Sequence, residues 1–335
     1  MKISIVLNNY NYAEYAQLCI ESALAQSYPN TEIVVVDDGS TDNSWEILQQ
    51  YRSRVILDRQ KNGGQGAAYN RGYELSTGEI VCFLDSDDLL AVDACRSIAA
   101  IDWTGVTKVQ GKLQIIDGSG KASGRMIPFG DASERAVHRT WARFGHYNSP
   151  PGSGNFYHRA FLEKTLPMDR DFWRISADAC LILQAPFFGR VQYCTEIIGS
   201  YRIHGNNASA QNLSQSGEID VNRYATKELR KELRRQSLVI RTNKSLGGKQ
   251  CVVHDTPSML KLRIARYRTS RRELRPIFYR AVLLKRTCYV FAYWDGYSLK
   301  KKAGALMWML AATVLPKKLA RRLVEKTIYP YKRGY

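Results

Sequence analysis

Apolar and polar residues alternate in blocks along the first part of the chain. Four short, mostly apolar runs lie at 3–7, 32–36, 54–57 and 79–84. Between them, residues 13–27 and 66–75 place apolar side chains at helical spacing, and Asp42 can cap a further helix. Strands that are apolar throughout and alternate with helices are typical of a parallel sheet covered on both faces. The pattern therefore predicts an α/β domain.

Two of the predicted strands run directly into carboxylates. Residues 33–36 are followed by Asp37 and Asp38, and residues 80–84 are followed by the stretch 85–88, Asp-Ser-Asp-Asp. In parallel sheets, ligands bind at the carboxyl ends of the strands. We therefore expect the two acidic groups to share one crevice, although they are far apart in the sequence.

Each acidic group allows two interpretations. Two carboxylates one residue apart, such as Asp85 and Asp87, repel each other unless a hard divalent cation binds them, and such a cation can also bridge a diphosphate. Alternatively, Asp87 or Asp88 caps a helix that begins at Leu89. Asp37 and Asp38 can likewise belong to a turn before a capped helix. These residues alone do not decide between the two.

The rest of the chain divides into weaker patterns. Residues 106–130 predict a hairpin with its turn at 117–120, residues 159–190 are mainly helical, and residues 205–217, rich in Asn, Ser and Gln, indicate a mobile loop. Only a short apolar run follows Lys2 before Asn8, so the first residues predict a strand and not a signal peptide. We expect one domain at 1–215 and a second, mainly α-helical region at 216–335.

The positive charge is concentrated in that second region. Residues 221–335 contain 29 Lys and Arg against 6 Asp and Glu, whereas residues 1–220 contain 20 against 25, within a net charge of +18. The seven cysteines include no Cys-x-x-Cys pair, and several lie in apolar runs. We interpret them as small buried thiols of a reducing cytoplasm, not as disulfides or a zinc site.

One stretch of the basic region favours contact with a membrane. Residues 303–316 are uncharged, are flanked by lysines at both ends and contain Trp308. They are too few to span a bilayer but suit a helix lying in the interface of an anionic membrane. The alternative is a helical appendage with a solvated basic face. Nucleic-acid binding is a further alternative for a basic region with interleaved aromatic residues, but no known module is present, so we expect no nucleic-acid partner.

Ordered motifs over about the first 210 residues resemble the family 2 glycosyltransferases. The resemblance begins with residues 4–44, "SIVLNNYNYAEYAQLCIESALAQSYPNTEIVVVDDGSTDNS", and continues through 62–72 and "GEIVCFLDSDD" (78–88). It extends to "SGNFYHR" (153–159), "ISADACLILQAPFFG" (175–189) and "YRIHGNN" (201–207). This resemblance implies a GT-A fold, with a Rossmann-like mixed, mainly parallel sheet flanked by helices. It also implies transfer of a sugar from a nucleotide-sugar donor with inversion at the anomeric carbon.

The resemblance also implies roles for individual residues. Those expected to bind the nucleotide are Asn8, Tyr10, Asp37, Asp38, Asn62, Gly63 and Asp85. Asp87 is the expected metal ligand for Mn²⁺ or Mg²⁺, with Asp88 in reserve. His204 is expected either to reach the metal or diphosphate or to be a structural loop histidine.

The acceptor side of the site is expected around Asp178, which matches the position of the catalytic base. The family often has Glu-Asp there, whereas this chain has Ala177 before Asp178. Asp178 can also cap the helix that follows. Gly152, Ser153 and Gly154 are expected to form a flexible acceptor-side loop. Trp173 is expected either to stack on a sugar or to lie in the core.

Together these expectations describe a metal-dependent inverting glycosyltransferase. Its donor is expected to be a nucleotide sugar, with UDP-sugars favoured, and its acceptor a saccharide or a lipid-linked saccharide in bacterial surface polysaccharide assembly. We expect it in the cytoplasm, peripheral on the cytoplasmic face of the membrane. A catalytically degenerate member of the family is the alternative, against which the presence of Asp38, Asp87 and Asp178 argues.

Overall fold

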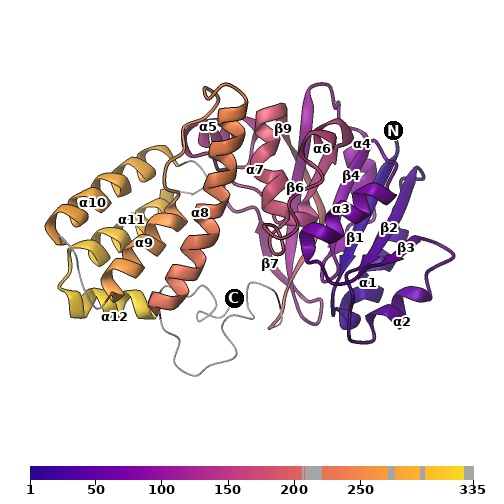
Figure 1. Ribbon diagram of the computed structural model, residues 1–335, viewed down its shortest axis with the longest axis horizontal. Coiled ribbons are helices and arrows are strands. Elements are labelled where there is room, and N and C mark those ends of the chain that lie inside the picture. Colours follow the sequence, from indigo (N-terminus) through magenta and orange to yellow (C-terminus); the bar gives the residue numbers. More distant parts are fainter. Residues whose placement is uncertain (206, 208–220, 271–275, 295–298, 328–335) are drawn as a thin grey trace. The chain divides into compact units, whose positions relative to one another are not determined.

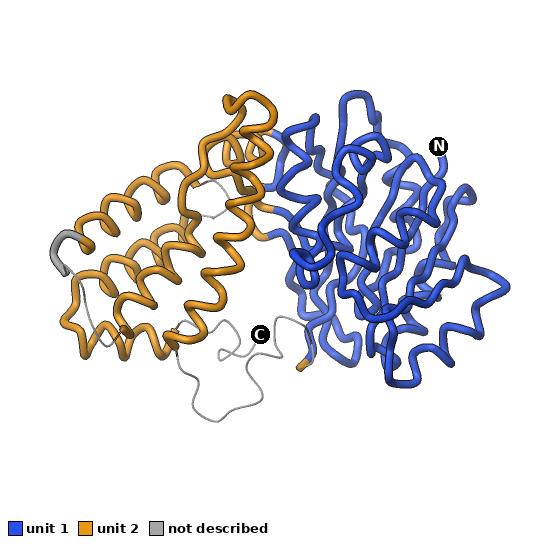
Figure 2. Tube along the Cα trace, in the orientation of Figure 1, with its two compact units in different colours: residues 1–128, 132–134, 149–204 blue, residues 129–131, 135–148, 205–335 orange. Residues whose placement is uncertain are grey.

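The computed structural model divides the chain into two compact units (Figure 2). It describes residues 1–205, 207, 221–270, 276–294 and 299–327. The first unit comprises residues 1–128, 132–134 and 149–204, and the second comprises 129–131, 135–148 and 205–335. The first unit in this division ends at 204, and the expected boundary was 215. Residues 135–148 belong to the second unit although residues of the first follow them.

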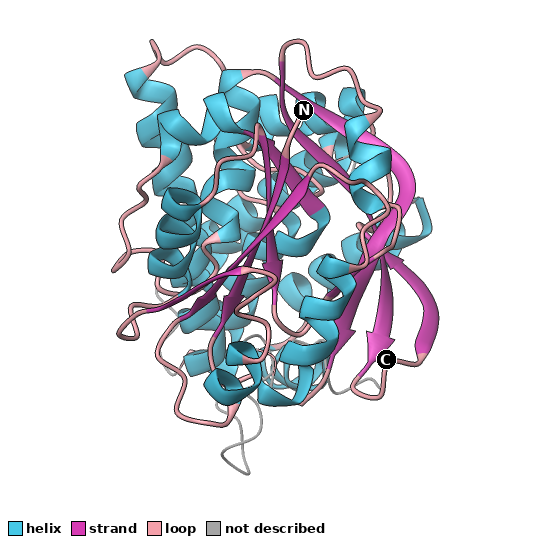
Figure 3. Cartoon of the chain, turned by 90° about the vertical axis from the view of Figure 1, so that its right-hand side faces the viewer, coloured by secondary structure: helices cyan, strands magenta, loops and turns pink. Residues whose placement is uncertain are grey.

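One sheet forms the centre of the first unit, with helices beside it (Figures 1 and 3). In the described residues it contains nine strands, in the order β3-β2-β1-β4-β8-β6-β9-β5 with β7 paired to β6. The strands are β1 (Ile3–Asn9), β2 (Thr31–Asp37), β3 (Ile56–Arg59), β4 (Ile80–Asp85), β5 (Leu89–Leu90), β6 (Val106–Asp117), β7 (Ala122–Ile127), β8 (Asn155–His158) and β9 (Arg190–Ile203). The predicted α/β class is confirmed.

The parallel half of the sheet brings the two acidic groups to one edge. β1 lies between β2 and β4 and is parallel to both. In this register Asn9 of β1 is opposite Asp37 of β2, and Asn8 of β1 is opposite Asp85 of β4. The carboxyl ends of β2 and β4 therefore lie on either side of the end of β1, as the sequence predicted.

Helices connect these strands and bury their apolar faces on the sheet. The helices of the first unit are α1 (Ala13–Leu24), α2 (Ser44–Gln49), α3 (Gln65–Leu75), α4 (Ala94–Ala99), α6 (Arg159–Thr165) and α7 (Asp178–Phe188), with one 3₁₀ turn, η1 (Gly152–Gly154). Asp42 receives the backbone N–H of Ala13 and of Ser44, at the starts of α1 and α2. It therefore stabilises the starts of two helices, where the sequence predicted one.

The second half of the sheet differs more from the sequence prediction. The hairpin at 106–130 is confirmed, with β6 and β7 antiparallel. The region 159–190 contains two helices separated by residues 166–177, and β8 and the 14-residue β9 had not been predicted. Of the predicted mobile loop at 205–217, all but residues 205 and 207 lie outside the described residues. Six cysteines are buried as predicted, but Cys288 is exposed.

The second unit contains helices joined by loops, and no strand, among its described residues. Its helices are α5 (Glu134–Phe144), α8 (Val221–Ser245), α9 (Pro257–Thr269), α10 (Pro276–Tyr293), α11 (Leu299–Val314) and α12 (Lys317–Thr327). Helix α9 packs against α8, α10, α11 and α12, and its residues Met259, Leu260 and Ile264 lie in the core of the unit. Within the described ranges, no helix is both long and apolar enough to cross a bilayer.

Candidate active site

Asp38, at the end of β2, fixes a glycine loop. One carboxylate oxygen accepts hydrogen bonds from the Gly63 N–H (2.8 Å) and the Gln60 side chain, and the other accepts from the Gly64 N–H (2.7 Å). Asn62 donates to the Asp38 carbonyl oxygen at 3.0 Å. The predicted nucleotide-binding residues Asp38, Asn62 and Gly63 therefore lie together, joined by their own hydrogen bonds.

Asp37 is buried and its carboxylate shapes the neighbouring turn. It accepts from the backbone N–H of Ser40 (3.1 Å) and from Asn9 (3.1 Å), and it pairs with Arg59 at 3.2 Å. Both oxygens are therefore used within the protein. Asp37 lies beside the predicted nucleoside position, but these contacts give it a structural task. Tyr10, which is 44% exposed, lies just beyond β1 and is open to solvent.

Asp85, at the end of β4, is held in place by two amide side chains. Its Oδ1 accepts from Asn8 at 3.0 Å and from Gln65 at 3.1 Å. Burial, followed by the charges of Asp87 and Asp178, raises the pKa of Asp85 to about 7 against these hydrogen bonds. A carboxylate under such repulsion is suited to binding a cation or a positively polarised group.

Asp87 lies against the aromatic side chains of Tyr12 and His204. Its Oδ2 is 3.1 Å from His204 Nε2, and Tyr12 hydrogen-bonds to the same carboxylate. Burial, together with the nearby acidic residues, raises the pKa of Tyr12. The buried Arg202 donates its Nε–H to the Asp87 carbonyl oxygen at 2.8 Å, so β9 holds the Asp-x-Asp stretch from the other side. The structure therefore brings the predicted metal ligands Asp87 and His204 together.

Asp88 joins the turn at Ser153 to strand β9 through hydrogen bonds. It is fully buried, accepts from the Ser153 hydroxyl at 2.6 Å, and accepts from the Arg202 N–H at 2.9 Å. Burial and the neighbouring carboxylates Asp87 and Asp85 raise its pKa well above the usual range. Both oxygens of Asp88 therefore take part in hydrogen bonds within the protein, and its role as a reserve metal ligand stays a prediction.

Gly152 connects the Asp-x-Asp edge with Asp178. A Cβ atom on Gly152 would lie 2.8 Å from the Tyr69 hydroxyl, 3.4 Å from Asp85 Oδ2 and 3.6 Å from Asp178 Cβ. Only a glycine allows this approach. Asp178 is the first residue of α7 and is partly exposed, so its carboxylate lies at a helix N-terminus beside Asp85. The candidate base and the first carboxylate of the Asp-x-Asp pair thus share one wall.

The acceptor-side residues are more buried than a flexible loop would be. Gly152, Ser153 and Gly154 form a buried 3₁₀ turn, not a flexible loop, because Ser153 bonds to Asp88 and also accepts from the Asp85 N–H at 3.2 Å. Trp173 is 4% exposed, and its carbonyl oxygen accepts from the Gly66 N–H at 3.0 Å. Trp173 therefore lies in the core, the second of its two expected positions.

The sequence of this chain is similar to those of known proteins. The model of the family described as "Glycosyl transferase family 2" matches residues 4–164. An uncharacterized glycosyltransferase of Nostoc sp. is 37% identical over 235 residues, which is 68% of this chain and 73% of that protein. The chain belongs to glycosyl transferase family 2. It is accordingly an enzyme of the transferase class, as the resemblance implied.

Other members of glycosyl transferase family 2 and solved structures are more distant. The poly(ribitol-phosphate) beta-glucosyltransferase of Bacillus spizizenii is 38% identical over 133 residues, which is 36% of this chain and 20% of that enzyme. The structure of S. aureus TarS in complex with UDP-GlcNAc has a TM-score of 0.53 at 18% identity, covering all of this chain and 92% of the other. The mannosyltransferase PcManGT of Pyrobaculum calidifontis, in complex with GDP-Man and Mn²⁺, has a TM-score of 0.51 at 16% identity, covering 98% of this chain and 85% of the other. These structures support the GT-A fold.

Several residues of this family 2 site were missed from the sequence. Tyr12 contacts Asp87, Gln65 joins Asp85 to the N–H of Ala177 (2.9 Å), and Arg202 holds Asp87 and Asp88. Gln65 and Arg202 stand in or beside stretches that carried the family resemblance, so a signal was present for both. Their partners lie 20 to 115 residues away along the chain, and only the fold brings them together.

The donor types at this edge fit a hard divalent cation. Asp85 and Asp87 provide carboxylate oxygens, which suit Mn²⁺ or Mg²⁺, and His204 adds an imidazole nitrogen, which Mn²⁺ accepts more readily than Mg²⁺. Asp85 Oδ2 faces Gly152, and the hydrogen bonds that Asp85 accepts from Asn8 and Gln65 go to its other oxygen. Over the described part of the chain, however, no three Asp, Glu, His or Cys side chains gather closely enough to hold a metal ion.

Proposed function

We propose that this glycosyltransferase moves a sugar from a nucleotide-sugar donor, with UDP-sugars favoured, to a hydroxyl of a saccharide or lipid-linked saccharide. The observation that carries the proposal is the meeting of Asp85 and Asp178 at Gly152, beside the Asp38 loop. The relatives support the donor class, since TarS was solved with UDP-GlcNAc and PcManGT with GDP-Man. The partial similarity to a poly(ribitol-phosphate) beta-glucosyltransferase supports a place in surface polysaccharide assembly.

In the proposed reaction, Asp178 removes the proton from the acceptor hydroxyl as its oxygen attacks the anomeric carbon. The new carbon–oxygen bond forms on the face opposite the leaving group, so the configuration is inverted. The bond from the anomeric carbon to the phosphate oxygen breaks, and the nucleoside diphosphate leaves with the electron pair. A divalent cation bound by Asp87, with His204 and Asp85 beside it, would stabilise the charge on the leaving diphosphate.

The first experiment is a thermal-shift titration with UDP, GDP, dTDP and CDP, each with and without Mn²⁺. A ligand that binds only the folded state at a hundredfold excess over its Kd stabilises it by about 2.7 kcal/mol. We expect one nucleotide, UDP foremost, to raise Tm more with Mn²⁺ than without it. Asp87→Ala should abolish the Mn²⁺-dependent part, whereas Asp171→Ala, at an exposed position, should not. If no nucleotide raises Tm, the donor class proposed here is wrong and the degenerate alternative gains support.

We further propose that the second unit binds an anionic membrane surface, where a lipid-linked acceptor would be found. Helix α11 supports this, because Leu299, Met307 and Val314 are 85%, 66% and 62% exposed. Their spacing of eight and seven residues puts them on one side of the helix. Lys300–Lys302 precede this face, and Lys317 and Lys318 follow it.

Trp308 makes contacts within the second unit. Its ring is partly buried, its Nε1–H donates to the Thr327 hydroxyl at 2.6 Å, and the Lys261 ammonium lies 5.4 Å from the ring centroid. Trp308 therefore joins α11 to α12 and α9. The residues available to enter a membrane interface are the aliphatic ones on the opposite side.

A further inference from the structure

Lys108 carries a buried amine close to the candidate base. It lies on β6, and its side chain is 0% exposed. Burial holds the pKa of Lys108 well below its usual range, and the charge of Asp178 opposes this effect. Removing an ammonium group from water costs several kcal/mol, so an apolar side chain of similar length would be cheaper at this position. Packing alone therefore does not account for a lysine here.

The contacts of Lys108 lead to the turn beside Asp178. Its Nζ donates to the Ser149 hydroxyl at 2.8 Å, and this hydroxyl is 3.1 Å from Asn155 Oδ1. The Asn155 side chain, also fully buried, donates to the carbonyl oxygens of Pro150 (3.2 Å), Pro151 (2.7 Å) and Gly152 (3.3 Å). Residues 149–154 are thus held by two buried polar side chains.

The held segment forms part of the site wall. A Cβ atom on Gly152 would lie 3.4 Å from Asp85 Oδ2 and 3.6 Å from Asp178 Cβ, and Ser153 bonds to Asp88. Asp178 is also within electrostatic reach of Asp85 and Tyr69, so this turn lies beside several charged or polar groups. A displacement of residues 149–154 would change the surroundings of these groups in the site.

We propose that Lys108 is a positioning residue of the transfer reaction, which fixes residues 149–154 beside Asp85 and Asp178 through Ser149 and Asn155. Its catalytic consequence rests on the proposed function, whereas its effect on the turn does not. The reaction requires its reacting groups to be placed to within a fraction of an ångström. The rate gained by fixing the turn therefore outweighs the folding free energy lost by burying the amine.

The first test measures the turn itself by amide hydrogen exchange of the full chain. Lys108→Met removes the donor and nearly keeps the side-chain length. We expect exchange in the peptide covering 152–155 to become about tenfold faster, which corresponds to about 1.4 kcal/mol of lost local protection. Lys112→Met, four residues further on the same strand and partly exposed, is the matched control and should not change it. Unchanged exchange in Lys108→Met would overturn the proposal.

A second variant covers the case in which Lys108→Met does not fold. Ser149→Ala keeps the amine and removes its partner, and it should accelerate exchange in the same peptide. The double variant should exchange no faster than Lys108→Met alone, because both substitutions break one chain of contacts. Additive effects would show that Lys108 and Ser149 support the turn independently, against the proposal.

The catalytic consequence is tested by hydrolysis of UDP-GlcNAc or GDP-mannose, in which water takes the place of the acceptor. We expect Lys108→Met to lower kcat about 10- to 100-fold with the donor Kd unchanged and Tm not lowered, a separation that a merely structural role would not give. Wild-type kcat together with a loosened turn would overturn the positioning role. If the wild-type chain binds neither donor, the proposed function fails, and the exchange result still decides whether Lys108 holds the turn.

Discussion

Asp178 is fixed at the start of α7 by its neighbours in the chain. Ser176 has a positive φ of 62°, a conformation that a non-glycine residue adopts at a cost, and the Ala177 N–H is bonded to Gln65. Gln65 also donates to Asp85, so one side chain sets the distance between the two halves of the site. The absence of the Glu-Asp pair is thus compatible with a well-placed Asp178.

The role of Asp178 is tested by Asp178→Asn, which keeps the shape and removes the base. We expect donor hydrolysis or transfer to fall by about 10²- to 10⁴-fold, the usual contribution of a general base, with nucleotide binding retained. Thermal shift with the best nucleotide provides the binding measurement, and Asp171→Asn, at an exposed position in the preceding segment, is the matched control. Loss of nucleotide binding together with activity would instead make Asp178 structural.

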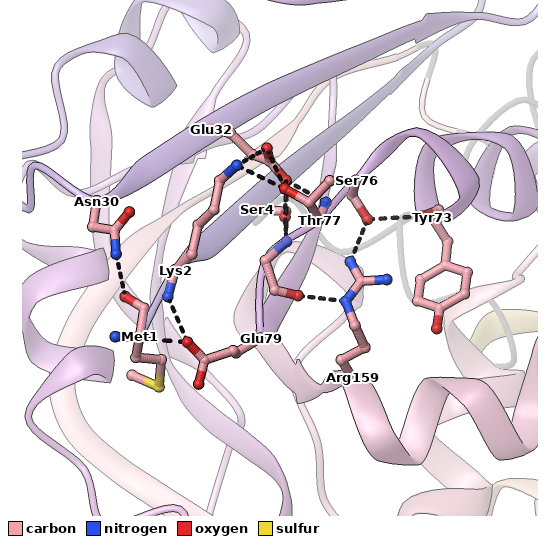
Figure 4. A network of polar contacts seen from close by, with 11 residues as sticks. Met1, Lys2, Ser4, Asn30, Glu32, Tyr73, Ser76, Thr77, Glu79 and Arg159 are labelled. Atoms are coloured by element: carbon pink, nitrogen blue, oxygen red, sulfur yellow. Dashed lines mark hydrogen bonds and ion pairs between the residues drawn. The ribbon is translucent and has the colours of Figure 1, made fainter.

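At the scale of the elements, Glu32 joins three segments at the opposite end of the parallel strands (Figure 4). Glu32 lies on β2. Its carboxylate accepts hydrogen bonds from Ser4 of β1 and from Thr77 and Gly78, which precede β4, and it forms an ion pair with Lys2. Burial opposes ionisation of Glu32, but the hydrogen bonds from Lys2, Ser4 and Thr77 outweigh it and lower its pKa to about 2. The network therefore depends on an ionised Glu32.

The folded-state pKa of Glu32 is depressed, so its contribution to stability is present above its unfolded pKa and is lost as the pH falls from about 4.5 towards 2. After allowance for solvent screening, we expect Glu32→Gln to lower the free energy of unfolding by about 1–2 kcal/mol at pH 7 and by much less near pH 2. Urea unfolding at both pH values measures this. Glu79→Gln, whose side chain is 64% exposed, is the control and should have little effect. An equal loss at both pH values would contradict the assignment to ionisation.

The elements also show what the sequence can and cannot predict. The strands β1, β2 and β4 are mostly apolar and end in polar residues, so both their existence and their common edge could be predicted. The exposure pattern of β9 does not alternate regularly, because polar residues such as Arg202 are buried by contacts with the loop after β4. The bracing role of Asp88 and the inclusion of α5 in the second unit depend on residues distant in sequence, which no local pattern encodes.

At the scale of the whole molecule, the two regions of the chain differ in charge. The excess of Lys and Arg over Asp and Glu falls entirely in residues 221–335, and the region before it is slightly acidic. Such a distribution favours an anionic partner for the second region, with each Lys or Arg near an anionic lipid surface contributing about 1 kcal/mol. The exposed aliphatic residues of α11 would add apolar burial, which charge alone does not provide.

This membrane proposal predicts both a salt dependence and a residue dependence. The full chain should co-sediment with vesicles that contain an anionic phospholipid at low salt, should bind neutral phosphatidylcholine vesicles weakly, and should be released as salt screens the charges. Met307→Asp should weaken binding roughly tenfold or more, because it places a carboxylate in the aliphatic face of α11. Ile240→Asp, at a 51% exposed position on α8 of the same unit, is the matched control and should bind as the wild type does.

If the chain does not bind anionic vesicles at low salt, the membrane proposal is wrong and the basic region is a helical appendage. If both variants bind equally, charge alone accounts for the attraction and α11 does not enter the interface.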